Sequence, residues 1–160
     1  LKFINQHYIK LLDDEVVFNK IISKMNKELL NEECVERIKK SIPLIKSRGQ
    51  TINDLVDLAS IFISYSSSID DQSKDILALN ESKQLLKNIL CVFEEEQNWN
   101  AETLKQLCSN LAKELNIKTS IIMKALRAGV LGTFKSPPIY QTLEILTKKE
   151  VMSRISQIIN

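Results

Sequence analysis

Glycine and proline are scarce in this chain, with three of each among 160 residues. Two of the glycines and two of the prolines fall within one stretch, LRAGVLGTFKSPPIY, at positions 126–140. With so few glycines, the sequence contains no glycine-rich phosphate-binding loop. Outside this stretch, residues that break helices are almost absent. The strongest turn signal of the sequence therefore lies at 126–140.

Cysteine and histidine are also rare, which argues against the usual metal and catalytic sites. The three cysteines, Cys34, Cys91 and Cys108, are odd in number and far apart, so neither a disulfide framework nor a zinc knuckle is indicated. We expect buried thiols in a reducing compartment. His7 is the single histidine and has no Cys or carboxylate motif around it, so we expect neither a metal site nor a catalytic residue.

Long apolar runs are absent as well. No stretch approaches the roughly 18 apolar residues of a membrane helix, and the apolar start of the chain is too short for a signal peptide. With 44% hydrophobic and 26% charged residues, the composition is typical of a globular protein without a membrane partner, and we expect it in the cytoplasm. The chain lacks an initiator Met, which indicates a fragment of a longer protein.

Charge is distributed unevenly although the net charge is only +2. Residues 1–99 hold 13 Lys and Arg against 16 Asp and Glu, whereas residues 100–160 hold 9 against 4. The basic excess of the last third indicates an anionic partner that docks there.

Apolar residues recur at helical spacing along most of the chain, and no segment has the period of a strand. Pro43 should break or kink one of these helices. The segments from Thr51 to Asp54 and from Thr147 to Glu150 indicate capped helix starts. The polar stretch SYSSSIDDQS, at 64–73, indicates a boundary. We predict an all-α fold of two small helical subdomains, residues 1–68 and 69–160, which need not be rigidly fixed to one another.

The stretch 126–140 predicts a helix end, a short loop and a helix start. Gly132 can adopt the positive φ that ends a helix, and Ser136 before Pro137 has the pattern of an N-cap followed by a first-turn proline. A helix start presents backbone N–H groups and the positive end of the dipole. Together with Arg127 and Lys135, this arrangement suits an RNA backbone or an unstacked base. An ordinary helix–helix corner is the alternative.

Four segments carry a resemblance to a known family. They are, in order, LKFINQHYIKLLDDE, IPLIKSRGQTINDLVDLASIF, WNAETLKQLCSNLAKELNIK and LRAGVLGTFKSPPIYQTLEILTKKEVMSRI. Together they resemble the C-terminal region of bacterial-type glutamyl-tRNA synthetases, which are class I aminoacyl-tRNA synthetases. Leu131 and Pro138 depart from the Thr and Gly usual in that family. The family's two ATP-site signatures, of the His-Ile-Gly-His and Lys-Met-Ser-Lys types, occur nowhere in the sequence.

The resemblance implies an anticodon-binding helical bundle that recognises the anticodon loop of tRNA-Glu and acts as a monomer. The full-length enzyme would use ATP, with magnesium, to charge the tRNA with glutamate. Without the ATP-site signatures, this fragment should hold no catalytic residue and no cofactor and should be inactive alone.

Contacts with the anticodon are also implied by the resemblance. Arg127 would contact a base edge, Ser136 would use its hydroxyl or a backbone group, and Pro137 and Ile139 would offer apolar surface under unstacked bases. Gly132 and Lys135, identified above from the turn pattern, would support this loop.

A second arginine of the family contacts the third anticodon base, and its position matches Arg48 or, by a small shift of register, Gln50. Whether the enzyme discriminates tRNA-Glu from tRNA-Gln depends on this residue and stays open. A different class of function is a helical protein–protein adaptor whose basic last third binds an acidic partner. No group of candidate catalytic residues in the sequence supports an independent helical enzyme.

Overall fold

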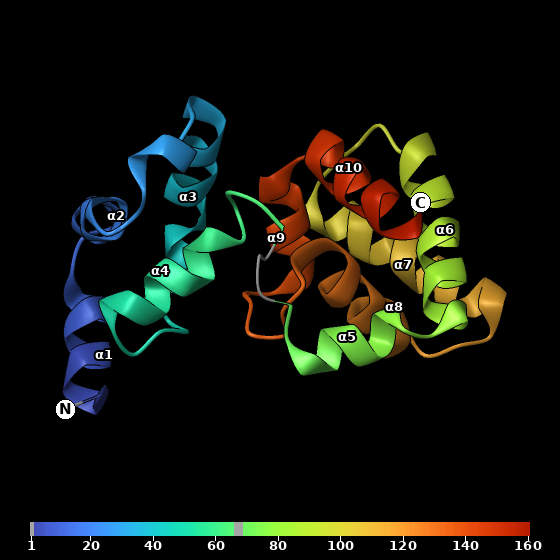
Figure 1. Cartoon of the computed structure of the whole chain (residues 1–160), viewed down its shortest axis with the longest axis horizontal. Coiled ribbons are helices and arrows are strands. Elements are labelled where there is room, and N and C mark those ends of the chain that lie inside the picture. Colours follow the sequence, from blue (N-terminus) through green and yellow to red (C-terminus); the bar gives the residue numbers. More distant parts are fainter. Residues whose placement is uncertain (1, 66–68) are drawn as a thin grey trace. The chain divides into compact units, whose positions relative to one another are not determined.

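The computed structural model describes residues 2–65 and 69–160, and every regular element within them is helical (Figure 1). The prediction of an all-α fold is therefore confirmed. Contacts group the chain into two compact units, Leu1–Ser64 (unit 1) and Tyr65–Asn160 (unit 2). The predicted boundary after residue 68 lies outside the described residues.

Unit 1 contains four α-helices and one short 3₁₀ helix. They are α1 (Lys2–Leu11), α2 (Asp14–Ser23), η1 (Lys27–Leu29), α3 (Glu32–Ile45) and α4 (Ile52–Ser60). α2 packs on both α3 and α4, and their apolar faces form the core of the unit. The fully buried side chains include Val17, Ile21, Ile38, Ile42, Leu55 and Phe62.

Pro43 was predicted to break or kink a helix, and it lies inside α3, which does not break there. The helix continues to Ile45, two residues beyond the proline. A proline has no backbone N–H, so it cannot donate a hydrogen bond to the carbonyl four residues earlier, which here is the carbonyl of Lys39. Lys39 and Pro43 are both exposed, and water can bond that carbonyl instead. The cost of the proline is therefore small at this end of the helix.

The predicted cap at Thr51 is confirmed. Thr51 Oγ1 accepts from the N–H of Asp54 at 3.1 Å, and Asp54 Oδ2 accepts from the N–H of Thr51 at 3.2 Å. The same carboxylate oxygen accepts from the N–H of Gln50 at 2.9 Å. These reciprocal bonds satisfy donors at the helix start and fix the 48–51 turn that leads into α4.

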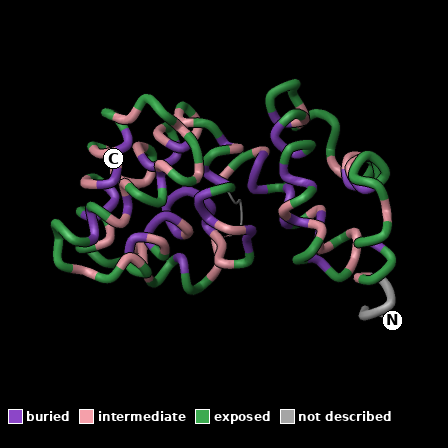
Figure 2. Tube along the Cα trace, turned by 180° about the vertical axis from the view of Figure 1, so that it is seen from behind, coloured by how far each residue is buried: buried purple, intermediate pink, exposed green. Residues whose placement is uncertain are grey.

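Unit 2 is built around three longer helices that pack against shorter ones. Its elements are α5 (Asp71–Leu77), α6 (Asn80–Glu95), α7 (Ala101–Leu115), α8 (Thr119–Leu126), the π-helical turn η2 (Arg127–Leu131), α9 (Ile139–Leu146) and α10 (Lys148–Ile159). α10 packs along α6, and α7 packs on α9. Buried positions recur along the helices, between exposed ones (Figure 2). No helix of the described residues is long and apolar enough to cross a bilayer.

The start of α10 differs from the predicted capping box. Thr147 has φ 77° and ψ 154°, and its side chain makes no cap hydrogen bond. Glu150 accepts instead from Arg154 Nε at 3.0 Å, one turn further along the helix. The helix begins where the pattern predicted, at Lys148, but the capping box does not form, and the N–H of Thr147 donates to the carbonyl of Glu144 at 3.3 Å instead.

Lys148 and Trp99 fasten the α6–α7 connection to the last two helices. Lys148 Nζ donates to the carbonyl oxygens of Glu94 and Glu96 at 2.8 and 2.7 Å. Trp99 Nε1 donates to the carbonyl of Leu143 at 2.9 Å. Lys148 is therefore a structural residue of unit 2 rather than a freely solvated charge.

Replacing Gly129 with alanine should destabilise unit 2. A Cβ on Gly129, in the π turn, would lie 2.9 Å from both Cδ1 and Cδ2 of Leu86, which is fully buried on α6, so the Leu86 side chain would have to shift within the core. We expect a loss of about 1–3 kcal/mol, as for other overpacked cores. Urea unfolding followed by the fluorescence of Trp99, the only tryptophan, measures unit 2 by itself.

The exposed helix position Ser153→Ala is the control and should leave unfolding unchanged. Combining Gly129→Ala with Leu86→Val should cost less than the sum of the two single losses. Strict additivity would show that Gly129 and Leu86 do not compete for the same space.

Candidate nucleic-acid interface

The segment singled out by its glycines and prolines forms one connected loop, residues 127–139 (the 127–139 loop). It begins with the π turn, whose closing bond runs from the N–H of Gly132 to the carbonyl of Arg127 at 2.9 Å. Gly132 has φ 72°, as predicted for the residue that ends this helix. The left-handed glycine turns the chain away from α8 and into the loop.

The guanidinium of Arg127 spans the base of this loop. Its Nη1 donates to Ser136 Oγ and, at 3.3 Å, to the carbonyl oxygen of Pro137. Arg127 is half-buried, whereas Ser136 keeps only 7% of its surface exposed. These bonds join the two ends of the loop and hold the guanidinium in one orientation.

Ser136 does not cap α9, contrary to the prediction. α9 begins at Ile139, its N-cap residue is Pro138, and no side chain caps it there. A residue before proline is disfavoured in the helical region, so the Pro137–Pro138 pair delays the helix start by two residues. The carbonyl of Pro138 accepts from the N–H and Oγ1 of Thr142 at 3.1 and 2.8 Å, and the hydroxyl of Ser136 is left to bond Arg127.

Asp70 holds the middle of the loop. Its Oδ2 accepts from the N–H of Phe134 at 2.7 Å, and its own N–H donates to the carbonyl of Gly132 at 3.1 Å. Its Oδ1 accepts from the N–H of Ser73 at 2.8 Å and caps α5. Desolvation raises the pKa of Asp70, but hydrogen bonds from Ser73, Phe134 and Thr133 together bring it below its usual value.

Two further side chains bond the carbonyls of the π turn. Tyr65 Oη donates to the carbonyl of Ala128 at 2.7 Å, and Arg154 Nη1 donates to that of Val130 at 3.1 Å. Arg154 is 3% exposed, and Glu150 partly balances its charge. Burial and the nearby charge of Asp70 raise the pKa of Tyr65, while Arg154 opposes them. Tyr65 therefore stays a neutral hydroxyl donor.

Sequence reasoning missed Tyr65, Asp70 and Arg154, which we call the supporting residues. Tyr65 and Asp70 lie in the polar stretch 64–73, which the sequence analysis interpreted only as a boundary. One local signal was available, since Asp70 precedes α5 with the spacing of an N-cap. Nothing local indicated that these side chains also bond the 127–139 loop.

The predicted site residues of unit 2 share one segment but differ in exposure. Arg127, Gly132, Ser136 and Pro137 lie together in the 127–139 loop, and Lys135 is exposed within it. Pro137 is buried, and Ile139 is 2% exposed, so neither offers the apolar surface that was predicted for it. Thr133, Phe134 and Pro138 are half-buried and contribute to the loop's surface.

Arg48 and Gln50 belong to unit 1, in the turn between α3 and α4. Both side chains are exposed. The N–H of Arg48 donates to the carbonyl of Ile45 at 2.9 Å. Among the described residues, no hydrogen bond or ion pair of the Arg48 guanidinium is found. Both residues are therefore accessible to a partner.

The remaining chemistry-bearing residues form no reactive site. Cys34 and Cys108 are buried as expected, but Cys91 is exposed because its position on α6 faces away from the core. Burial raises the pKa of the Cys108 thiol to about 11, so it stays protonated. His7 is exposed, and the described residues contain no group of three or more side chains suited to hold a metal ion.

Comparison with known proteins decides the family. The family described as "Anticodon binding domain" matches residues 12–159, nearly the whole chain. The chain belongs to the anticodon binding domain family.

The relatives of this anticodon binding domain include proteins named as glutamate–tRNA ligases. "Glutamate--tRNA ligase 1" of Bartonella bacilliformis is 28% identical, over 100% of this chain and 35% of its own length. "Glutamate--tRNA ligase 2" of Rickettsia bellii is 27% identical, over 95% and 33%. A solved glutamate tRNA ligase from Elizabethkingia meningosepticum has the same fold, with a TM-score of 0.80 over 99% of this chain and 31% of that one, at 23% identity. The chain spans about a third of the length of the curated relatives it matches.

Asp70→Asn should loosen the 127–139 loop of this anticodon binding domain. The change removes a charged acceptor, which we expect to cost about 1 kcal/mol of local stability. Because the pKa of Asp70 lies below its ordinary value in the folded state, the carboxylate stabilises the fold above that ordinary value, and this contribution is lost as pH falls through the folded-state pKa. Hydrogen exchange at the Phe134 amide should be faster in the variant at pH 6, and the difference in unfolding free energy should shrink below about pH 4.

Asp71→Asn is the matched control, since Asp71 is exposed on the first turn of α5. It should leave exchange at Phe134 unchanged. Equal exchange in both variants would show that the charge of Asp70 does not hold the loop.

Proposed function

We propose that this chain recognises the anticodon loop of tRNA-Glu as the anticodon-binding part of a glutamate–tRNA ligase. Membership of the anticodon binding domain family carries the proposal, and the ligases of Bartonella and Rickettsia support the choice of tRNA. The complete enzyme would join glutamate to the tRNA with ATP and magnesium, in the cytoplasm and as a monomer. The family match does not favour a protein–protein adaptor.

The geometry of the 127–139 loop supports this role. Arg127 is held by Ser136 and Pro137, so its planar guanidinium is oriented before any partner arrives, and little entropy is lost on binding. Lys135 offers an exposed charge to a phosphate. Half-buried Phe134 and Pro138 offer apolar surface beside it.

Burial refines the roles implied by the resemblance. Ser136 and Ile139 expose 7% and 2% of their surface, so in this proposal they act mainly by position. Ser136 orients Arg127, and Ile139 fixes the start of α9 in the core. Direct contact with bases falls to Arg127 and to the backbone and half-buried side chains between 133 and 138.

Arg127→Ala should weaken binding to the anticodon stem-loop of tRNA-Glu. A guanidinium on a base edge is worth about 1–3 kcal/mol, a loss of about 5- to 140-fold in Kd. Lys149→Ala is the matched loss of one positive charge, because Lys149 is exposed on the last helix, whereas Lys148 holds the α6–α7 connection. Fluorescence anisotropy with a labelled stem-loop measures both.

The Lys149 variant should lose little affinity, and that loss should vanish at high salt. Equal losses for the two variants would reduce the interface to a diffuse basic surface. Wild-type binding that does not distinguish tRNA-Glu from other tRNAs would contradict the proposed function itself.

Arg48→Gln should narrow the preference for tRNA-Glu over tRNA-Gln. A cytosine at the third anticodon position offers acceptors to a guanidinium, whereas a guanine presents a larger and differently patterned edge. Loss of the arginine should therefore act chiefly by improving the wrong partner. Two stem-loops that differ only at this base, titrated with each variant, measure the ratio.

Two further variants are titrated in the same experiment, Gln50→Ala and, at an exposed position, Lys40→Gln. Lys40→Gln should leave the ratio unchanged. A change in ratio for Gln50→Ala, with none for Arg48→Gln, would assign the discriminating contact to Gln50 and leave Arg48 as a charge at the end of α3.

A further inference from the structure

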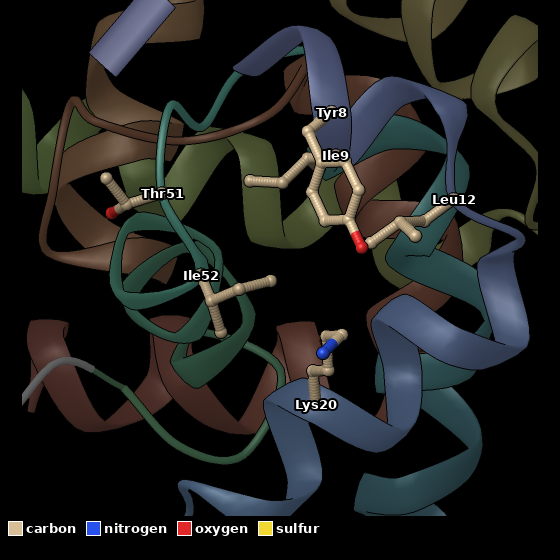
Figure 3. A pocket seen from close by; sticks show the side chains of 6 residues that line it. All are labelled: Tyr8, Ile9, Leu12, Lys20, Thr51 and Ile52. Carbon is tan, nitrogen blue, oxygen red and sulfur yellow. The ribbon is translucent and has the colours of Figure 1, made fainter. Parts of the chain in front are cut away.

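A pocket of about 230 Å³ opens between three helices of unit 1 (Figure 3). It is lined by side chains of α1, α2 and the start of α4: Tyr8, Ile9, Leu12, Lys20, Thr51 and Ile52. None of these residues belongs to the 127–139 loop, and only Thr51 was named in the sequence analysis, as a helix cap. The role proposed above does not use this pocket.

One aromatic ring and one amine face each other across the pocket. Figure 3 shows the ring of Tyr8 above the space and the side chain of Lys20 rising from the opposite side. Tyr8 is 58% exposed, although a tyrosine ring is largely apolar. Ile9, Leu12 and Ile52 add buried and half-buried apolar surface between them.

The charge that the described residues give the pocket is positive. Among those that line it, Lys20 alone has an ionised side chain, and none carries a carboxylate. Among the described residues, the Lys20 ammonium has no ion pair or hydrogen bond. Asp14, on the same helix α2, has its carboxylate engaged by Lys46 Nζ at 3.0 Å. An anionic group beside Lys20 would therefore gain a partner without displacing another.

The size of the pocket limits its occupant. Pockets for drug-sized ligands measure about 300–1,000 Å³, so this one suits a single flat ring system. A flat ring that stacks on Tyr8 and carries an anion toward Lys20 matches a nucleobase with its phosphate. Single-stranded RNA is bound through this combination of an aromatic platform and a cation.

We propose that this pocket binds one unpaired nucleotide of an RNA, with the base stacked on Tyr8 and the phosphate at Lys20. The proposal rests on the proposed function in that the RNA is tRNA-Glu. It adds a further contact, in unit 1, to those proposed for the 127–139 loop and for Arg48 or Gln50. Tyr8 and Lys20 would bind the nucleotide directly, and Ile9, Leu12 and Ile52 would line its apolar edge.

The test is the Kd of the complete chain for full-length tRNA-Glu, at two salt concentrations. Tyr8→Ala should weaken binding about 5- to 140-fold, the range for loss of an aromatic stacked on a base, and Tyr8→Phe should stay within about twofold of wild type. Lys20→Gln should weaken binding and lower the salt slope by about 0.7–0.9, as for loss of one phosphate contact. Lys10→Gln removes an exposed charge from the other side of α1 and should keep the wild-type slope.

The Arg127→Ala variant separates the two proposals. If Tyr8→Ala binds tRNA-Glu as wild type does while Arg127→Ala does not, the pocket is no nucleotide site and is left to another occupant, such as an apolar protein segment. If neither variant changes the Kd, both the pocket and the proposed contact of Arg127 are overturned, while failure of wild type to prefer tRNA-Glu over other tRNAs would overturn the proposed function. Because Tyr8 is largely exposed, its variants should keep the wild-type circular dichroism spectrum and melting temperature. A Tyr8→Phe loss as large as that of Tyr8→Ala would also overturn stacking.

Discussion

The buried carbonyl groups of the π turn impose the constraint on which the site depends. A buried carbonyl without a hydrogen-bond partner is costly, and a π turn shifts these groups out of the ordinary helical pattern. Ala128 and Val130 are fully buried, and Tyr65 and Arg154 donate to their carbonyls. Gly129 allows the turn to pack directly against Leu86. These hydrogen bonds and this packing hold the π turn in place, and the turn in its place positions Arg127.

Preorganisation is the functional consequence of this construction. The loop after the π turn is closed by Arg127 at its ends and by Asp70 in its middle, so its backbone does not have to be ordered when a partner binds. The polar segment before α5 is therefore not only a connection between two units. Through Asp70 it is part of the scaffold that holds the proposed anticodon contact.

Charge counts along the sequence overstate the basic surface of the last third. Arg154 is buried and Lys148 is bonded to two carbonyls, so neither presents a freely solvated charge. Lys135 and Lys149 are exposed, and Arg127 is half-buried. In unit 1, Arg48 and Lys20 present further cations, although the first 99 residues are acidic overall. The proposed recognition of an RNA therefore depends on where individual cations lie more than on net charge.

Local patterns determined the helices, because helical periodicity and caps involve residues within a few positions of one another. They predicted the capping box at Thr51, the left-handed Gly132 and, through four short segments in order, the family. Tertiary structure alone decided that Ser136 bonds Arg127 instead of capping α9, and that Ile139 is buried. It also decided the roles of Tyr65, Asp70 and Arg154, whose partners lie 63, 64 and 24 residues away. A hydrogen bond across such separations depends on how whole helices pack, which no short stretch of sequence encodes.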